Sequence, residues 1–217
     1  MLYNNIKKLF TKNFIWIILF ICIVCFLGLA EDVFTHEIMN GDIIGYNLVS
    51  KYLISDTLTP IMKCITWFGG AISLLLITFL LFIFIRNKKI SVCIIANLVI
   101  ITILNQAFKA ILQRPRPPEH RIINETGYSF PSGHSMISMA FYGYLIYLIY
   151  KYIKNKYLKW SLITILSLLI LSIGLSRIYL GVHYVSDVIA GFVISIAYLI
   201  VFTHIIYKWN RENRDEK

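Results

Sequence analysis

Charged residues are scarce in this chain. Only 15% of its 217 residues are charged and 58% are apolar, with a mean hydropathy of +0.72. An average globular domain carries about a quarter charged residues. The deficit excludes a disordered chain and leaves too little polar material to cover a folded surface in water. The composition therefore predicts an integral membrane protein.

Acidic residues are the scarcest charged type: there are 11, against 21 lysines and arginines, so the net charge is +10. The basic residues lie mostly in short segments between long apolar runs, as topology signals do in membrane proteins, and we expect no nucleic-acid partner. The four cysteines lie in or beside apolar runs rather than in polar loops. We expect them to be small buried side chains rather than a disulfide framework.

Six apolar runs approach or reach the roughly 20 residues that cross a bilayer core as a helix. Because lipid offers no partner to backbone groups, such unbroken runs favour helices. The sequence predicts an all-α polytopic membrane protein, a six-transmembrane-helix bundle with a short outer-face helical or loop segment. The runs are residues 14–30, 65–85, 91–108, 135–150, 160–176 and 188–207.

No internal repeat or flexible linker divides the chain, so residues 1–217 are predicted to form one membrane domain. Fourteen basic residues mark one side, which the positive-inside rule assigns to the cytoplasm. They are Lys7, Lys8, Lys12, Arg86, Lys88, Lys89, Lys151, Lys154, Lys156, Lys159, Lys208, Arg211, Arg214 and Lys217. We expect residues 1–13 and 208–217 to be cytoplasmic and residues 31–63 and 109–134 to lie on the outer face. The first run could also be a signal peptide, but its length favours a retained span.

Five other basic residues break this charge rule, because they fall on the predicted outer side: Lys109, Arg114, Arg116, Arg121 and Arg177. Charge at or inside the membrane boundary is costly, and it is by default a hypothesis of function. Three of these cations are named positions of short segments that also hold histidines, serines and an aspartate. The segments are Lys109-x6-Arg116-Pro117, Pro131-Ser132-Gly133-His134 and Ser176-Arg177-x5-His183-x3-Asp187.

These segments resemble, in order and spacing, the three signature motifs of the type 2 phosphatidic acid phosphatase superfamily. Its members are integral membrane lipid phosphatases, and they share their site with the vanadium haloperoxidases. The resemblance implies a metal-independent phosphatase without a cofactor, acting on a lipid phosphate or pyrophosphate in the bilayer. Small members of this layout resemble bacterial undecaprenyl pyrophosphate or phosphatidylglycerophosphate phosphatases, which suggests a bacterial plasma membrane with the site on the outer face. The oligomeric state stays open.

The residue types suit phosphoryl transfer on physical grounds as well. Lys109, Arg116 and Arg177 are three cations from separate segments that could close on one phosphate. Gly133 allows close approach of the backbone to an anion, and the helix expected after it would aim free N–H groups at the phosphate. His183 and Asp187 are four residues apart, so they would share one face of the last helix, where the carboxylate could hold a ring proton.

The resemblance also implies a role for each residue. His183 would attack phosphorus to give a phosphohistidine, Asp187 would orient it, and His134 would protonate the leaving oxygen and then activate water. The phosphate-binding residues would be Lys109, Arg116, Ser132, Gly133 and Arg177.

Two other functions remain open: a phosphotransferase that uses the same phosphohistidine, and a non-catalytic lipid-binding or transport protein. Arg114 and Arg121 could serve merely to attract anionic substrate or lipid head groups, and Glu119 and Glu125 could merely pair with these two arginines. We expect the three histidines outside the motifs to be structural, namely His36, His120 and His204. Asn105 and Gln106 could orient Lys109 or bond between helices.

Overall fold

The computed structural model describes residues 2–35, 39–118 and 121–215, and the side chains among them except those of residues 2–12, 50 and 210–215. His36, Glu119 and His120 lie outside the described residues. This part of the chain forms eight helices and no strand, which agrees with the predicted all-α class. The helices are α1 (Leu2–Phe34), α2 (Asn40–Tyr52), α3 (Leu58–Trp67), α4 (Ala71–Phe84), α5 (Lys88–Leu112), α6 (Gly133–Tyr152), α7 (Lys156–Tyr179) and α8 (Val185–Asp215).

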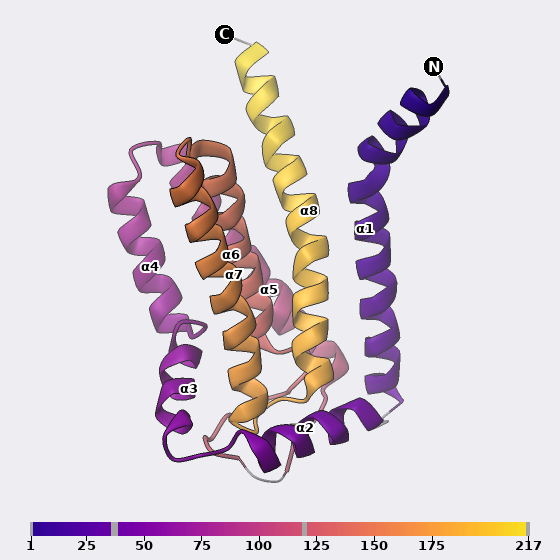
Figure 1. Ribbon diagram of the computed structural model, residues 1–217, viewed down its shortest axis with the longest axis vertical. Coiled ribbons are helices and arrows are strands. Elements are labelled where there is room, and N and C mark those ends of the chain that lie inside the picture. Colours follow the sequence, from indigo (N-terminus) through magenta and orange to yellow (C-terminus); the bar gives the residue numbers. More distant parts are fainter. Residues whose placement is uncertain (1, 36–38, 119–120, 216–217) are drawn as a thin grey trace.

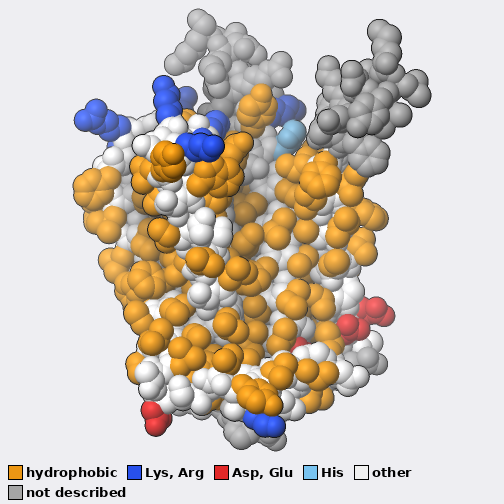
Figure 2. Space-filling model, in the orientation of Figure 1, with side chains coloured by type: hydrophobic (Ala, Val, Ile, Leu, Met, Phe, Trp, Pro, Cys, Tyr) orange, Lys and Arg blue, Asp and Glu red, His pale blue; other side chains and the backbone are white. Residues whose placement is uncertain are grey.

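The long helices run roughly along the long axis of the molecule, and α2 lies across one end of them (Figure 1). Both chain ends lie at the opposite end, where α1 and α8 extend beyond the other helices. In Figure 2, apolar side chains cover the middle of the visible face, and lysines and arginines gather at the end that holds the termini. This distribution is the one expected for a protein whose midsection faces lipid.

The helices fit the apolar runs, but the count of six spans is not confirmed. Among the described residues, four helical segments are long and apolar enough to cross a membrane on their own: Asn13–Phe34, Lys88–Leu112, Lys156–Tyr179 and Val185–Trp209. The bent pair α3 and α4 would make five. Helix α6 is not among them. It carries serines, tyrosines and a histidine, and it packs against α5, α7 and α8, so much of its surface meets protein rather than lipid.

The single span expected at residues 65–85 is wrong in detail, because the chain breaks between α3 and α4 and the two helices meet at 50°. The break falls at Gly69 and Gly70. A Cβ atom at Gly69 would lie 2.7 Å from Ile173 Cγ2 and 3.1 Å from His134 Cδ2, so only glycine fits there. The Ser73 hydroxyl donates to the carbonyl oxygens of Trp67 and Gly70 and satisfies the backbone at the break.

Other boundaries also differ from the sequence-based ones. The outer-face segment expected at 31–63 includes the end of α1, all of α2 and the start of α3, and the tail expected at 208–217 continues α8 as far as Asp215. Helix α5 extends to Leu112, so Lys109 lies in its last turn. Of the four free cysteines, Cys22 and Cys93 are buried as expected, whereas Cys25 and Cys64 are exposed on the outside of the bundle.

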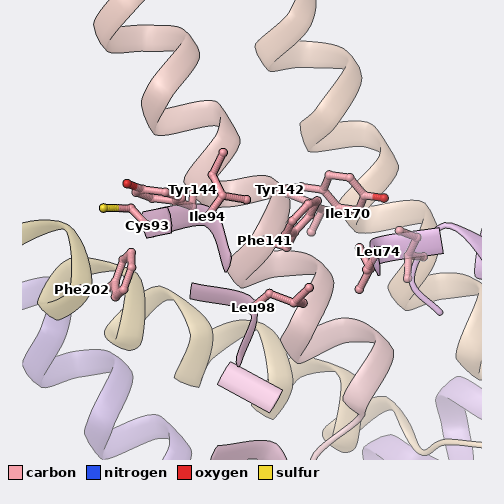
Figure 3. Packing of buried hydrophobic residues seen from close by; sticks show 10 residues of the cluster. Leu74, Cys93, Ile94, Leu98, Phe141, Tyr142, Tyr144, Ile170 and Phe202 are labelled. Carbon is pink, nitrogen blue, oxygen red and sulfur yellow. The ribbon is translucent and has the colours of Figure 1, made fainter. Parts of the chain in front are cut away.

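The main core lies between α4, α5, α6, α7 and α8. Figure 3 shows Phe141, Tyr142 and Tyr144 of α6 packed among residues of its neighbours. The Tyr142 hydroxyl donates to the Phe68 carbonyl oxygen at 2.8 Å, which ties α6 to the break between α3 and α4. A buried tyrosine usually satisfies its hydroxyl in this way. Helix α6 is thereby fixed against α3 and α4 as well as against α8.

The start of α6 packs directly on the start of α8. Ser132 N donates to the Asp187 carbonyl oxygen at 3.0 Å, and Ser195 Oγ donates to the Met136 carbonyl oxygen at 2.7 Å. A Cβ atom at Gly191 would lie 3.1 Å from both Met136 N and the Ser132 carbonyl oxygen. These neighbours are backbone atoms that cannot rotate away, so the two helices pack this closely because residue 191 is glycine.

We therefore expect Gly191→Ala to lower the melting temperature of the purified protein in detergent, at a cost of about 1–3 kcal/mol from forced repacking. Gly28→Ala is the matched control, because a Cβ atom at Gly28 meets nothing within 4 Å. Thermal unfolding of both variants checks this prediction. An unchanged melting temperature for Gly191→Ala would show that a Cβ atom fits between α6 and α8 without repacking.

Candidate active site

His183 and Asp187 of the third segment are in contact where α7 passes into α8. Gly181, with φ of +71°, turns the chain after α7, and His183 lies in that turn, two residues before α8 begins. The expectation that His183 and Asp187 share a helix face is therefore wrong for His183. Its Nδ1 still lies 3.2 Å from Asp187 Oδ2, because Asp187 stands in the first turn of α8.

The hydrogen bonds of His183 define its tautomer. Its Nε2 lies 3.1 Å from Arg116 Nη1, and a guanidinium can only donate, so Nε2 accepts and Nδ1 carries the proton. Burial, opposed by the hydrogen bond and charge of Asp187, lowers the pKa of His183 to about 4. The charges of Arg177 and Arg116 contribute to this lowering. A neutral imidazole with its Nε2 lone pair directed away from Asp187 is the form that a nucleophile requires.

The first segment supplies Lys109 from the end of α5 and Arg116 from the chain that follows. Gln113 ends the helix in the left-handed conformation with φ of 46°, and Pro115 prevents its continuation. Besides its contact with His183, Arg116 donates to the carbonyl oxygens of Thr126, Gly127 and Val182, each at 3.0 Å. Lys109 lies on the wall of a cavity, so this cation is accessible to a ligand.

The second segment forms the start of α6. Ser132 is its N-cap, and its Oγ accepts from Ser135 N and from the Ser135 hydroxyl. A Cβ atom at Gly133 would lie 3.0 Å from Asn105 Oδ1 and 3.9 Å from Lys109 Nζ. The absence of a side chain at Gly133 therefore lets α5 pack closely against the start of α6 and leaves room for an anion there. Asn105 bonds to the Pro131 carbonyl oxygen and to Met136 Sδ, so it links helices rather than orienting Lys109.

Arg177 is almost fully buried and is held from two sides. Its Nη2 lies 2.6 Å from Glu125 Oε1, and its Nη1 donates to Thr66 Oγ1 at 2.7 Å. Its Nε is buried and has no hydrogen-bond partner in the described part of the chain. Burial raises the pKa of Glu125, but the charge and hydrogen bond of Arg177 outweigh it and hold that pKa below its usual value. Glu125 thus pairs with Arg177, and not with Arg114 or Arg121 as one alternative had it.

The three segments converge at one end of the bundle. His134 lines one cavity together with Lys109 and Gly133, and a second cavity together with Arg177. The predicted catalytic and phosphate-binding residues are thus brought together. Arg121 is exposed, and it donates to the Pro117 carbonyl oxygen at 2.6 Å and to that of Arg116 at 3.4 Å.

Arg114 has a larger part in the site than the sequence indicated. It is 6% exposed, its Nη1 lies 2.7 Å from Asp187 Oδ1, and its Nη2 lies 2.8 Å from Asp42 Oδ2. Its guanidinium carbon also lies 4.1 Å from the centre of the Tyr184 ring. The position of Arg114 between two motif residues was a signal in the sequence, but nothing there pointed to Asp42 of α2.

Two cavities meet at His134. One, of about 310 Å³, lies between α4, α5 and α6, and its walls include Leu74, Leu98, Lys109 and Gly133. The other, of about 380 Å³, lies beside the break between α3 and α4, and its walls include Thr66, Glu125 and Arg177. An apolar wall leading to cations suits a lipid with an anionic head.

No cluster of His, Cys, Asp and Glu that could hold a metal ion occurs among the described residues. The site instead offers cationic donors, the N–H groups at the start of α6, a neutral imidazole backed by a carboxylate, and a second imidazole. Such a set can bind a phosphoryl group, attack it and move a proton.

Comparison with known proteins gives relatives of the same kind. The chain is 36% identical over 94 residues to phosphatidylglycerophosphatase B of Bacillus subtilis, a match that covers 42% of this chain and 45% of that protein. It is 30% identical over 193 residues to undecaprenyl-diphosphatase of Sulfolobus acidocaldarius, covering 84% and 86% of the two chains. It is also 29% identical over 150 residues to lipid A 4'-phosphatase of Porphyromonas gingivalis, covering 61% and 58%.

The fold is found in solved structures as well. The crystal structure of a transmembrane PAP2 type phosphatidylglycerolphosphate phosphatase from Bacillus subtilis superposes with a TM-score of 0.76 at 25% identity, covering 88% of this chain and 96% of that one. The sequence model of the PAP2 superfamily matches residues 89–211, which include all three segments. The resemblance seen in the motifs is therefore confirmed, and so is the prediction of an enzyme of the lipid phosphatase type. This chain belongs to the PAP2 superfamily.

Proposed function

We propose that this protein hydrolyses the terminal phosphate of a lipid phosphate or lipid pyrophosphate through a phosphohistidine at His183. The observation that carries the proposal is the hydrogen-bonded series from Asp187 to His183 to Arg116, with 3.2 Å and 3.1 Å between the joined atoms. It pairs a neutral nucleophile with a cation that binds phosphate. Substrate oxygens would take over donors of Arg116 and Arg177 and also meet Lys109 Nζ.

The proposed reaction has two steps. In the first, the Nε2 lone pair of His183 bonds to phosphorus, the bond from phosphorus to the lipid oxygen breaks, and His134 gives that oxygen a proton. In the second, His134 takes a proton from water, the resulting hydroxide attacks phosphorus, and the bond from phosphorus to Nε2 breaks to release phosphate. Asp187 keeps the Nδ1 proton in place and balances the charge of the ring throughout.

We further propose that the substrate is undecaprenyl pyrophosphate or phosphatidylglycerophosphate. Curated relatives carry names that state these two activities. The 310 Å³ cavity supports a lipid, because leucines of α4 and α5 line its apolar part while Lys109 and His134 stand at its polar end. A substrate that stays in the bilayer could enter there without leaving it.

A six-span topology with the site on the outer face completes the proposal. Both termini lie at one end of the bundle, which requires an even number of crossings (Figure 1). Counting α3 with α4 as one crossing, and α6 as another, gives six. The candidate site then lies at the end opposite the basic loops, which the positive-inside rule assigns to the extracytoplasmic side.

Purified protein in detergent, given undecaprenyl pyrophosphate or phosphatidylglycerophosphate and no acceptor, should release inorganic phosphate. His183→Ala should lower the rate by about a thousandfold or more, because no other group replaces the nucleophile. His204→Ala is the matched control, since His204 packs against Trp16 in the bundle and should keep near wild-type activity. Release that needs an added acceptor would indicate a phosphotransferase, and full activity of His183→Ala would remove the proposed nucleophile.

Excess chelator should leave the rate of phosphate release nearly unchanged. The reason is that arginines, a lysine and backbone N–H groups would supply the charge stabilisation that a divalent ion supplies elsewhere. Initial rates with and without EDTA test this, with added magnesium as the control. A rate that vanishes with EDTA and returns with magnesium would contradict the mechanism.

Cysteine labelling tests the topology. In a background with the four native cysteines replaced by alanine, Tyr128→Cys should react with a membrane-impermeant maleimide from outside intact cells, because residue 128 is exposed beside the site. Lys154→Cys, in the exposed turn between α6 and α7, is the matched control and should react only after permeabilisation. The reverse pattern would invert the proposed orientation.

A further inference from the structure

Asp42 lies in the first turn of α2, outside the residues 89–211 that the family model matches, yet it is only 2% exposed. Helix α2 approaches the start of α8 so closely that a Cβ atom at Gly45 would lie 2.4 Å from Val185 Cγ2. Val49 of α2 packs in the same apolar cluster as Val182 and Val188. These contacts hold the carboxylate of Asp42 next to the start of α8, beside the turn that contains His183.

The two oxygens of Asp42 accept three hydrogen bonds from residues around the catalytic pair. Its Oδ1 accepts from Ser186 N at 2.8 Å, and its Oδ2 accepts from Ser186 Oγ at 2.7 Å and from Arg114 Nη2 at 2.8 Å. Arg114 Nη1 donates in turn to Ser186 Oγ and to Asp187 Oδ1, both at 2.7 Å. Asp42, Ser186 and Arg114 thus bond to one another, and Arg114 connects them to the carboxylate of Asp187, which bonds to His183.

We infer that Asp42 is a positioning residue for the phosphatase reaction: through Arg114 and Ser186 it orients Asp187 and sets the net charge next to His183. This inference rests on the proposed function. Asp42 does not touch His183, and it is not among the residues that would bind phosphate. Its effect therefore falls on the reactivity of the nucleophile and not on substrate affinity.

A count of charges gives the physical reason. Arg114 carries one positive charge, and Asp42 and Asp187 carry two negative charges, so with a neutral His183 the group has a net charge of −1. When His183 bonds to phosphorus, its ring becomes cationic and the group becomes neutral. Without Asp42, Arg114 would cancel Asp187, and these side chains would leave no net negative charge to offset the new charge on the Nδ1 side of the ring, in a site where water screens little.

The test is phosphate release by the purified full chain in detergent, with undecaprenyl pyrophosphate or phosphatidylglycerophosphate. Asp42→Asn should lower kcat by about tenfold to a hundredfold and leave KM within about threefold of wild type. Asp42→Glu, which keeps the charge, should recover most of the loss. Asp56→Asn is the matched control, because the same change is made at an exposed residue beyond α2. Wild-type kcat in Asp42→Asn would overturn the inference.

A double variant separates charge balance from simple structural damage. Asp42→Asn combined with Arg114→Gln restores the net charge of −1, so its loss of kcat should be at least about tenfold smaller than the product of the two single losses. Multiplicative losses would overturn the inference. If Asp42→Asn does not yield folded protein, Ser186→Ala decides: its kcat should fall about tenfold at unchanged KM, and wild-type kcat would overturn the inference.

The same assays distinguish this inference from the function on which it rests. If the wild type releases phosphate and the Asp42 variants match it, only the positioning role is wrong. If the wild type releases no phosphate from either lipid, the proposed function is wrong and the positioning role with it.

Discussion

Three buried arginines at one end of the bundle must each be compensated, because an unpaired charge removed from water costs several kcal/mol. The protein solves this in two ways. Arg114 and Arg177 have carboxylate partners, whereas Arg116 is surrounded by backbone carbonyl oxygens and the ring of His183. The carboxylates come from α2, from the loop before α6 and from α8, so compensating these arginines brings distant parts of the chain to one place. They are Asp42, Glu125 and Asp187.

The helical class could be predicted from the sequence, because apolar runs report the average environment of a segment. The break at Gly69 and Gly70 could not, since it depends on Ile173 and His134 approaching from other helices. Helix α6 is a different case. It carries polar residues and packs against α5, α7 and α8, so its composition does not establish a span alone and the count of six is not confirmed.

For the site, local relations were predictable and distant ones were not. The spacing of His183 and Asp187 implied their contact, although His183 lies in the turn before α8 and not on the helix face that was expected. The pairing of Arg177 with Glu125 joins residues 52 positions apart, and that of Arg114 with Asp42 joins residues 72 positions apart. No periodicity links such residues, and Asp42 has no sequence motif around it. Only the packing of α2 on α8 shows that it belongs to the site.

The two kinds of compensation give the arginines different parts to play. The partners of Arg116 are neutral carbonyl oxygens and an imidazole, so an anion could displace them and gain a full charge interaction. Glu125 is partly exposed and could be hydrated when phosphate replaces it on Arg177. Asp42 and Asp187 are almost fully buried, so releasing either from Arg114 would strand charge in the protein interior. Phosphate should therefore exchange partners with Arg116 and Arg177, while Arg114 keeps its two carboxylates and holds His183 in place throughout the reaction.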